Sequence, residues 1–170
     1  MPVGQVGSPH RQQAALAAIS QQLAAAPDLL GALVVGSLAA GTADAASDID
    51  LIICTRPGRF ADAWARRHEL HATGALVSWD HQRQTAAEIA VHRWVTPDFV
   101  LVEALFAAPG SGARLAQPWT LIAGEPEVAA AFTARPPIDR SEMSRDAAHP
   151  VEQAYDDLKA ALRRLAAGDP

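Results

Sequence analysis

The sequence predicts one domain of the α/β class, and three observations support this. Residues 10–25, "HRQQAALAAISQQLAA", carry Ala and Leu at three- and four-residue spacing, which is typical of an amphipathic helix. Two aliphatic segments, "GALVVGS" at 31–37 and "DIDLIICT" at 48–55, have the composition of buried strands. "EIAVHRWV" and "FVLVEALFA" are two further strand-like runs. A chain of 170 residues has the size of one ordinary domain.

The two later runs predict a β-hairpin around Pro97 and Asp98. Pro presets a turn torsion, and Asp can accept a hydrogen bond from the nearby backbone. A two-residue turn would set Glu103 opposite His92, and a three-residue turn would set it opposite Val91. The residues leave this register open, and a slip of one residue would move Glu103 to the other face of the sheet.

The rest of the chain adds shorter elements. "RFADAWARRHELHA" has helical spacing and ends before Gly74. A short strand is expected around "WTLIAG" and a short helix from Pro126 to Ala134. The Pro-rich segment 135–149 predicts a linker or a strap, and 150–168 predicts a C-terminal helix between Pro150 and Gly168.

Composition excludes several classes of protein. Hydrophobic residues make up 49% of the chain and charged residues 19%, which is a globular balance. A net charge of -5 without a long basic cluster argues against extensive nucleic-acid contact. The apolar segments are too short to span a membrane. Because Cys54 is the single cysteine, no internal disulfide can form, and an intracellular, cytoplasmic setting is expected.

Asp48 and Asp50 are acidic residues within a strand-like aliphatic run. Residues two apart in a strand point to the same face, so the two carboxylates would repel by roughly 2 to 3 kcal/mol at an effective dielectric near 20. A Mg²⁺ ion between them would reverse the sign of this energy. A solvated strand end is the alternative. The other acid-x-acid pair, Glu125 and Glu127, surrounds a proline at a helix start and complements the helix dipole.

Gly36 and Ser37 lie upstream, where the first strand ends and a short helix is expected. Glycine lets the backbone approach a ligand closely, and the serine hydroxyl can donate to a phosphate oxygen. Exposed backbone N–H groups at such a point favour a phosphate. By itself the Gly-Ser step is only a turn. It indicates a phosphate-binding site only in combination with the aspartate pair that follows.

Together these residues resemble the signature of the nucleotidyltransferase superfamily, typified by DNA polymerase β and the aminoglycoside nucleotidyltransferases. The resemblance rests on Gly36-Ser37, ten intervening residues and "DIDL" at 48–51, and "LAAGTADAASDIDL" is especially similar to the small bacterial members. It implies a small mixed sheet with helices on one face, here within a domain of residues 1–134. It also implies two Mg²⁺ ions held by Asp48, Asp50 and a third carboxylate, with Gly36 and Ser37 at the phosphates of an NTP, expected to be ATP.

The third carboxylate has two candidates. Glu103 is embedded in the aliphatic run "VLVEALF", the context in which the family carries its third acid. Asp98 follows Pro97 and is already explained as a turn former. Glu103 is therefore our choice, because an unpaired buried carboxylate is costly.

Other polar residues have a structural and a functional interpretation. His68 and His71 lie three apart and could share a metal ion, but their spacing matches no zinc motif and favours a surface helix face. Arg93 could contact a phosphate or the substrate, whereas an exposed strand cation is the simpler interpretation. Cys54 continues a buried strand and is most simply part of the core.

The resemblance predicts transfer of NMP from an NTP to a hydroxyl of a small molecule or a protein. Two alternatives remain: an antitoxin-like partner of a helical toxin protein, and an inactive nucleotide-binding protein. The apolar stripe at 151–165 could join two copies of the chain or bind a helical partner.

Overall fold

The computed structural model describes residues 9–84, 87–135, 157 and 160. Residue 135 lies in a strand, and positions 157 and 160 are helical. The rest of the predicted linker and C-terminal helix, including most of the apolar stripe at 151–165, lies outside the described residues.

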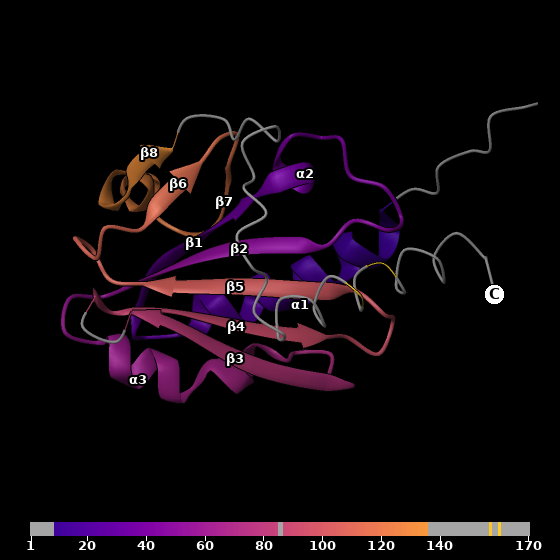
Figure 1. Ribbon diagram of the computed structural model, residues 1–170, viewed down its shortest axis with the longest axis horizontal. Coiled ribbons are helices and arrows are strands. Elements are labelled where there is room, and N and C mark those ends of the chain that lie inside the picture. Colours follow the sequence, from indigo (N-terminus) through magenta and orange to yellow (C-terminus); the bar gives the residue numbers. More distant parts are fainter. Residues whose placement is uncertain (1–8, 85–86, 136–156, 158–159, 161–170) are drawn as a thin grey trace, which may run out of the picture.

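A six-stranded mixed sheet organises the domain (Figure 1). Its strand order is β3-β4-β5-β2-β1-β7, in which β2 and β5 are parallel and the other neighbours are antiparallel. This confirms the expected mixed α/β fold. The strands are β1 (Leu29–Val35), β2 (Ile49–Thr55), β3 (Val77–Gln84), β4 (Ile89–Val95), β5 (Leu101–Ala107) and β7 (Thr120–Gly124).

The main helices cover one face of this sheet, as Figure 1 shows for α1. The first helix, α1 (His10–Ala25), has the predicted boundaries and buries Ala15, Ile19 and Leu23 against the sheet. Their four-residue spacing keeps them on one side of the helix. From β2, the alternating residues Ile49, Leu51 and Ile53 point into the same core. No helix within the described residues is long and apolar enough to cross a bilayer.

The opposite face of the sheet has a smaller cluster of buried residues. Leu33, Ile52 and Cys54 contribute to it from β1 and β2. It also includes residues near the 3-10 helix η3 (Pro126–Ala131) and the two-stranded sheet of β6 (Arg114–Ala116) and β8 (Thr133–Arg135). Cys54 is fully buried, and burial raises the pKa of its thiol to about 11. The prediction that it belongs to the core is confirmed.

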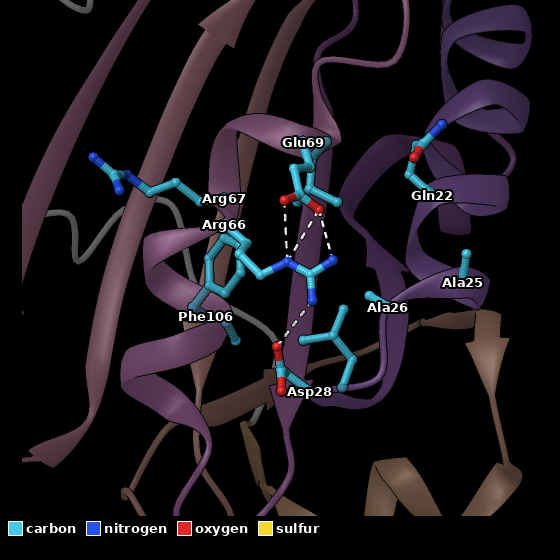
Figure 2. A pocket seen from close by; sticks show the side chains of 11 residues that line it. Gln22, Ala25, Ala26, Asp28, Arg66, Arg67, Glu69 and Phe106 are labelled. Carbon is cyan, nitrogen blue, oxygen red and sulfur yellow. Dashed lines mark hydrogen bonds and ion pairs between the residues drawn. The ribbon is translucent and has the colours of Figure 1, made fainter.

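The helix expected over 59–72 is broken at Arg66 into α3 (Phe60–Ala65) and the 3-10 helix η1 (Arg67–Leu70). Figure 2 shows the Arg66 side chain between Asp28 and Glu69. Its Nη1 lies 3.3 Å from Asp28 Oδ2, and its Nε donates to Glu69 Oε1 over 3.0 Å. Arg59 Nη2 also donates to Asp28 over 2.6 Å. Tertiary ion pairs to a buried carboxylate therefore accompany the break in an otherwise helical pattern.

The β4–β5 hairpin forms as predicted, but both predicted registers are wrong. Glu103 lies opposite Arg93, because Val95 pairs with Leu101 and the turn is therefore centred on Asp98. Thr96 closes it: its backbone N–H donates to the Val100 carbonyl, and its hydroxyl accepts from the Val100 N–H over 3.1 Å. Within the turn, Phe99 adopts a φ of 58°. The Thr96 side chain therefore acts as part of the turn, beside the predicted turn residues Pro97 and Asp98.

Candidate active site

Two of the predicted acidic residues, Asp50 and Glu103, meet where the parallel strands β2 and β5 run side by side. Asp50 and Glu103 are direct partners in the register of these strands. Adjacent strands lie about 4.8 Å apart, and residues in register point to the same face. Along their strands, Asp50 and Glu103 alternate with residues that pack in the core of the helix-covered face. Their side chains therefore lie on the opposite face of the sheet. Asp48 is one residue before β2.

The Gly-Ser step lies against this acidic pair. Val35, the last residue of β1, is paired with Asp50, and Gly36 opens the short helix α2 (Gly36–Ala39) with a φ of 70°. A Cβ atom built on Gly36 would lie only 2.5 Å from Asp50 Oδ2. Only glycine fits this position without displacing the carboxylate. Gly36 is exposed and Ser37 is half-buried, so this turn borders solvent beside Asp50.

A compact turn holds the loop that leads into Asp48. Asp44 Oδ1 accepts from the backbone N–H of Ala46 and from the Ser47 hydroxyl, both over 2.9 Å. These hydrogen bonds lower the pKa of Asp44, with the Ser47 hydroxyl as the largest cause. Gln12 of α1 is buried and donates through Nε2 to the carbonyls of Ala45 and Ser47, over 3.1 and 2.8 Å. Sequence reasoning missed this positioning role of Gln12, because its partners are more than thirty residues away.

Arg93 lies in the same row of side chains. It pairs with Glu103 in the β4–β5 register, and its Nε donates to Glu103 Oε2 over 2.7 Å. The Arg93 side chain is 6% exposed and that of Glu103 is 29% exposed. The interpretation of Arg93 as an exposed strand cation is therefore wrong. Its contact with a phosphate or substrate stays a prediction.

Asp98, the rival third acid, lies elsewhere. It is exposed in the β4–β5 turn, and its backbone carbonyl accepts from Arg11 Nη1 over 3.1 Å. Glu103, not Asp98, occupies the register position beside Asp50.

The donor set fits the divalent metal that the resemblance implies. Carboxylate oxygens are the ligands that Mg²⁺ prefers, and Asp50 and Glu103 present them from neighbouring strands on one face. The absence of a side chain at Gly36 leaves room for Asp50 Oδ2. Asp48, Asp50 and Glu103 are the residues that would hold the metal.

The other face of β4 carries a cluster of histidines, which corrects the prediction of a simple surface helix face. His68 lies in η1 and His71 follows it, and both meet the fully buried His92 of β4. Burial lowers the pKa of His71 to about 4, with the neighbouring His92 and His68 acting in the same direction. Burial also lowers the pKa of His92, against the raising effect of Asp80. His71 and His92 are therefore neutral near pH 7.

A small cavity of about 80 Å³ lies between α1 and the α3–η1 segment, next to Asp28 and Arg66 (Figure 2). Ligand pockets for molecules of nucleotide size occupy about 300 to 1,000 Å³. This cavity is therefore too small to hold a nucleotide.

A mixed sheet with helices on one face and paired carboxylates beside a Gly-Ser turn on the other is the arrangement that the resemblance to nucleotidyltransferases implies. Among solved structures, the chain is similar to a cytoplasmic RNA terminal U-transferase, with 26% identity and a TM-score of 0.42. It is also similar to the Cid1 poly(U) polymerase, with 25% identity and a TM-score of 0.41. Each match covers 57% of this chain, but only 28% and 30% of the respective structures.

Similarity at this level carries no argument about the function of this chain. No family model matches the chain, and no curated protein matches it.

Proposed function

We propose that the chain is a metal-dependent nucleotidyltransferase that transfers NMP from an NTP, expected to be ATP, to a hydroxyl group. The observation that carries the proposal is the placement of Asp50 beside Glu103 at the Gly36 turn. Gly36 and Glu103 are 67 positions apart in the chain, and the three residues come from three different elements, α2, β2 and β5. A merely solvated strand end would not require this convergence.

The residues of the chain have separate roles in this proposal. Asp48, Asp50 and Glu103 would hold two Mg²⁺ ions, and Gly36 and Ser37 would contact the terminal phosphates. Bound Mg²⁺ would supply charge neutralisation on the phosphates and a template for in-line displacement. Arg93 fixes Glu103 through the 2.7 Å hydrogen bond. Gln12 and Asp44 hold the loop in front of Asp48.

In the reaction, the oxygen of the acceptor hydroxyl forms a bond to the α-phosphorus of the NTP. The bond from that phosphorus to the oxygen bridging to the β-phosphate breaks, and pyrophosphate leaves with the electron pair. The hydroxyl proton passes to a carboxylate of the site, for which we choose Glu103. Most of the acceleration would come from positioning and charge stabilisation.

The acceptor is a small molecule or a protein side chain in this proposal. To test it, the chain is incubated with each α-labelled NTP, Mg²⁺ and pooled hydroxyl acceptors, and both pyrophosphate release and labelled product are measured. Asp50→Asn should abolish release while the circular dichroism spectrum is unchanged. Glu127→Gln is the matched control, since Glu127 belongs to the other acid-x-acid pair and should leave the rate unchanged.

A second pair of variants tests the choice of third acid. Glu103→Gln should abolish pyrophosphate release, and Asp98→Asn should retain it. The reverse result would transfer the role to Asp98. If wild-type protein binds ATP without releasing pyrophosphate for any acceptor, the chain is a nucleotide-binding protein and the transferase proposal is wrong.

A further inference from the structure

Three histidines converge on the helix-covered face of the sheet, away from the acidic residues. One ring nitrogen from each of His68, His71 and His92 lies within 4.8 Å of the other two. The Nε2 atoms of His71 and His92 are 2.8 Å apart. The three ring centroids are separated by 4.9 to 5.3 Å. The chain brings these rings together from η1, the segment after it and β4.

The buried member of the cluster is oriented by a carboxylate. His92 is fully buried, and its Nδ1 lies 2.6 Å from Asp80 Oδ1. With the proton on Nδ1 donated to Asp80, the Nε2 lone pair of His92 points toward His71. Metal-binding histidines are commonly held in this way by a carboxylate on the other ring nitrogen. Asp80 is itself held by Arg67, whose Nε donates to it over 2.9 Å.

The distances suit a transition-metal ion bound by imidazoles. In a tetrahedral site with Zn–N bonds of about 2.1 Å, the ligand nitrogens lie about 3.4 Å apart. The observed separations, from 2.8 Å to at most 4.8 Å, lie on both sides of this value. The exposed His68 can rotate to close the longer ones, whereas Asp80 keeps His92 in place.

We propose that His68, His71 and His92 form a binding site for one divalent transition-metal ion of the zinc class. Nitrogen ligands favour Zn²⁺ and its neighbours over Mg²⁺, which prefers oxygen. Three protein ligands leave a fourth tetrahedral position for water or another small ligand. Because His68 is exposed, this position would face solvent. The ion would replace the proton shared by the two Nε2 atoms, and His71 would carry its proton on Nδ1 instead.

The histidine site does not depend on the proposed transferase function. It lies on the opposite face of the sheet, although β4 connects the two: His92 points to the helix-covered core and its neighbour Arg93 to Glu103. A metal at the histidines would therefore fix η1 against β4 without being a ligand of the acidic site. Either proposal can fail while the other stands.

The test is a metal titration of the full chain after removal of bound metal with a chelator. Millimolar Mg²⁺ is kept in the buffer so that the acidic residues are occupied. Zn²⁺ binding is measured by calorimetry, and Co²⁺ binding by visible absorption, which reports tetrahedral coordination. We expect one ion per chain with a tetrahedral Co²⁺ spectrum, and a rise in Tm on binding.

Variants assign the ligands. His68→Ala and His71→Ala should lose Zn²⁺ binding, and Asp80→Asn should weaken it by about 10- to 100-fold through the orientation of His92. His10→Ala is the matched control, because His10 is exposed on α1 outside the cluster and should not change binding. The exposed His68 can be replaced with little effect on folding, which circular dichroism verifies.

Three results would overturn the proposal. The first is wild-type protein that binds neither Zn²⁺ nor Co²⁺ at micromolar concentration. The second is binding that survives in both His68→Ala and His71→Ala. The third is binding that is lost in the double variant Asp48→Asn/Asp50→Asn but kept in the histidine variants, which would place the ion at the acidic residues.

Discussion

Replacing Gly36 by alanine should disturb the acidic site more than it disturbs the fold. Gly36 has a φ of 70°, and a Cβ atom there would lie 2.5 Å from Asp50 Oδ2. Holding an L-residue in this left-handed region costs roughly 1 to 2 kcal/mol. Real Cβ atoms essentially never approach another atom closer than 3.0 Å. The Asp50 carboxylate, or the turn itself, must therefore move by about 0.5 Å or more.

Gly58→Ala is the matched control for this substitution. Gly58 has the same φ of 70°, but nothing lies within 4 Å of its Cβ position. Both variants should lose about 1 to 2 kcal/mol of unfolding free energy in urea titrations, because both carry the same backbone strain. Their difference isolates the contact with Asp50.

The assay for that difference is steady-state pyrophosphate release. A displacement of about 1 Å at a reacting group can cost roughly 100-fold in rate, so we expect Gly36→Ala to lose between tenfold and 100-fold, to order of magnitude, in kcat. Gly58→Ala should keep the wild-type kcat. A Gly36→Ala protein that is folded and retains wild-type turnover would refute the reasoning that Gly36 makes room for a working Asp50.

Three further perturbations probe the structure around the site. Thr96→Val removes the hydroxyl that accepts the Val100 N–H, and we expect a loss of about 1 to 3 kcal/mol in unfolding free energy; an unchanged urea midpoint would contradict this role in the turn. Gln12→Met removes both side-chain hydrogen bonds to the loop before Asp48, and pyrophosphate release should fall in a protein that still folds cooperatively, whereas an unaltered rate would show that the loop needs no such anchor. The Arg59 guanidinium holds the pKa of Asp28 below its usual value. The ionised Asp28 carboxylate therefore contributes stability above about pH 4, and this contribution is lost as the pH falls through the lowered pKa. The difference in Tm between wild type and Asp28→Asn should therefore shrink between pH 7 and pH 3, and a constant difference would exclude this linkage.

Long elements with strong periodicity could be predicted from the residues alone. The boundaries of α1 and the presence of β1, β2, β4, β5 and β7 follow from apolar spacing and composition. The edge strand β3, "VSWDHQRQ", was not predicted, because six of its eight residues are polar and its apolar residues, Val77 and Trp79, are confined to its start. The sheet recruits it by hydrogen bonding to β4, which is a tertiary effect.

The local sequence determined the chemistry of the acidic site. A Gly-Ser step after a buried run and two aspartates in a strand identify the carboxylates, because strand alternation and glycine's freedom at positive φ act over a few residues. Only the tertiary structure decided which distant side chains join them. The parallel pairing of β2 and β5 set Glu103 beside Asp50, and a threonine-closed turn set Arg93 on Glu103. The tertiary structure likewise brought His92 to His68 and His71, which are more than twenty residues away in the chain. No short segment encodes such contacts, because strand register and packing are properties of the whole sheet.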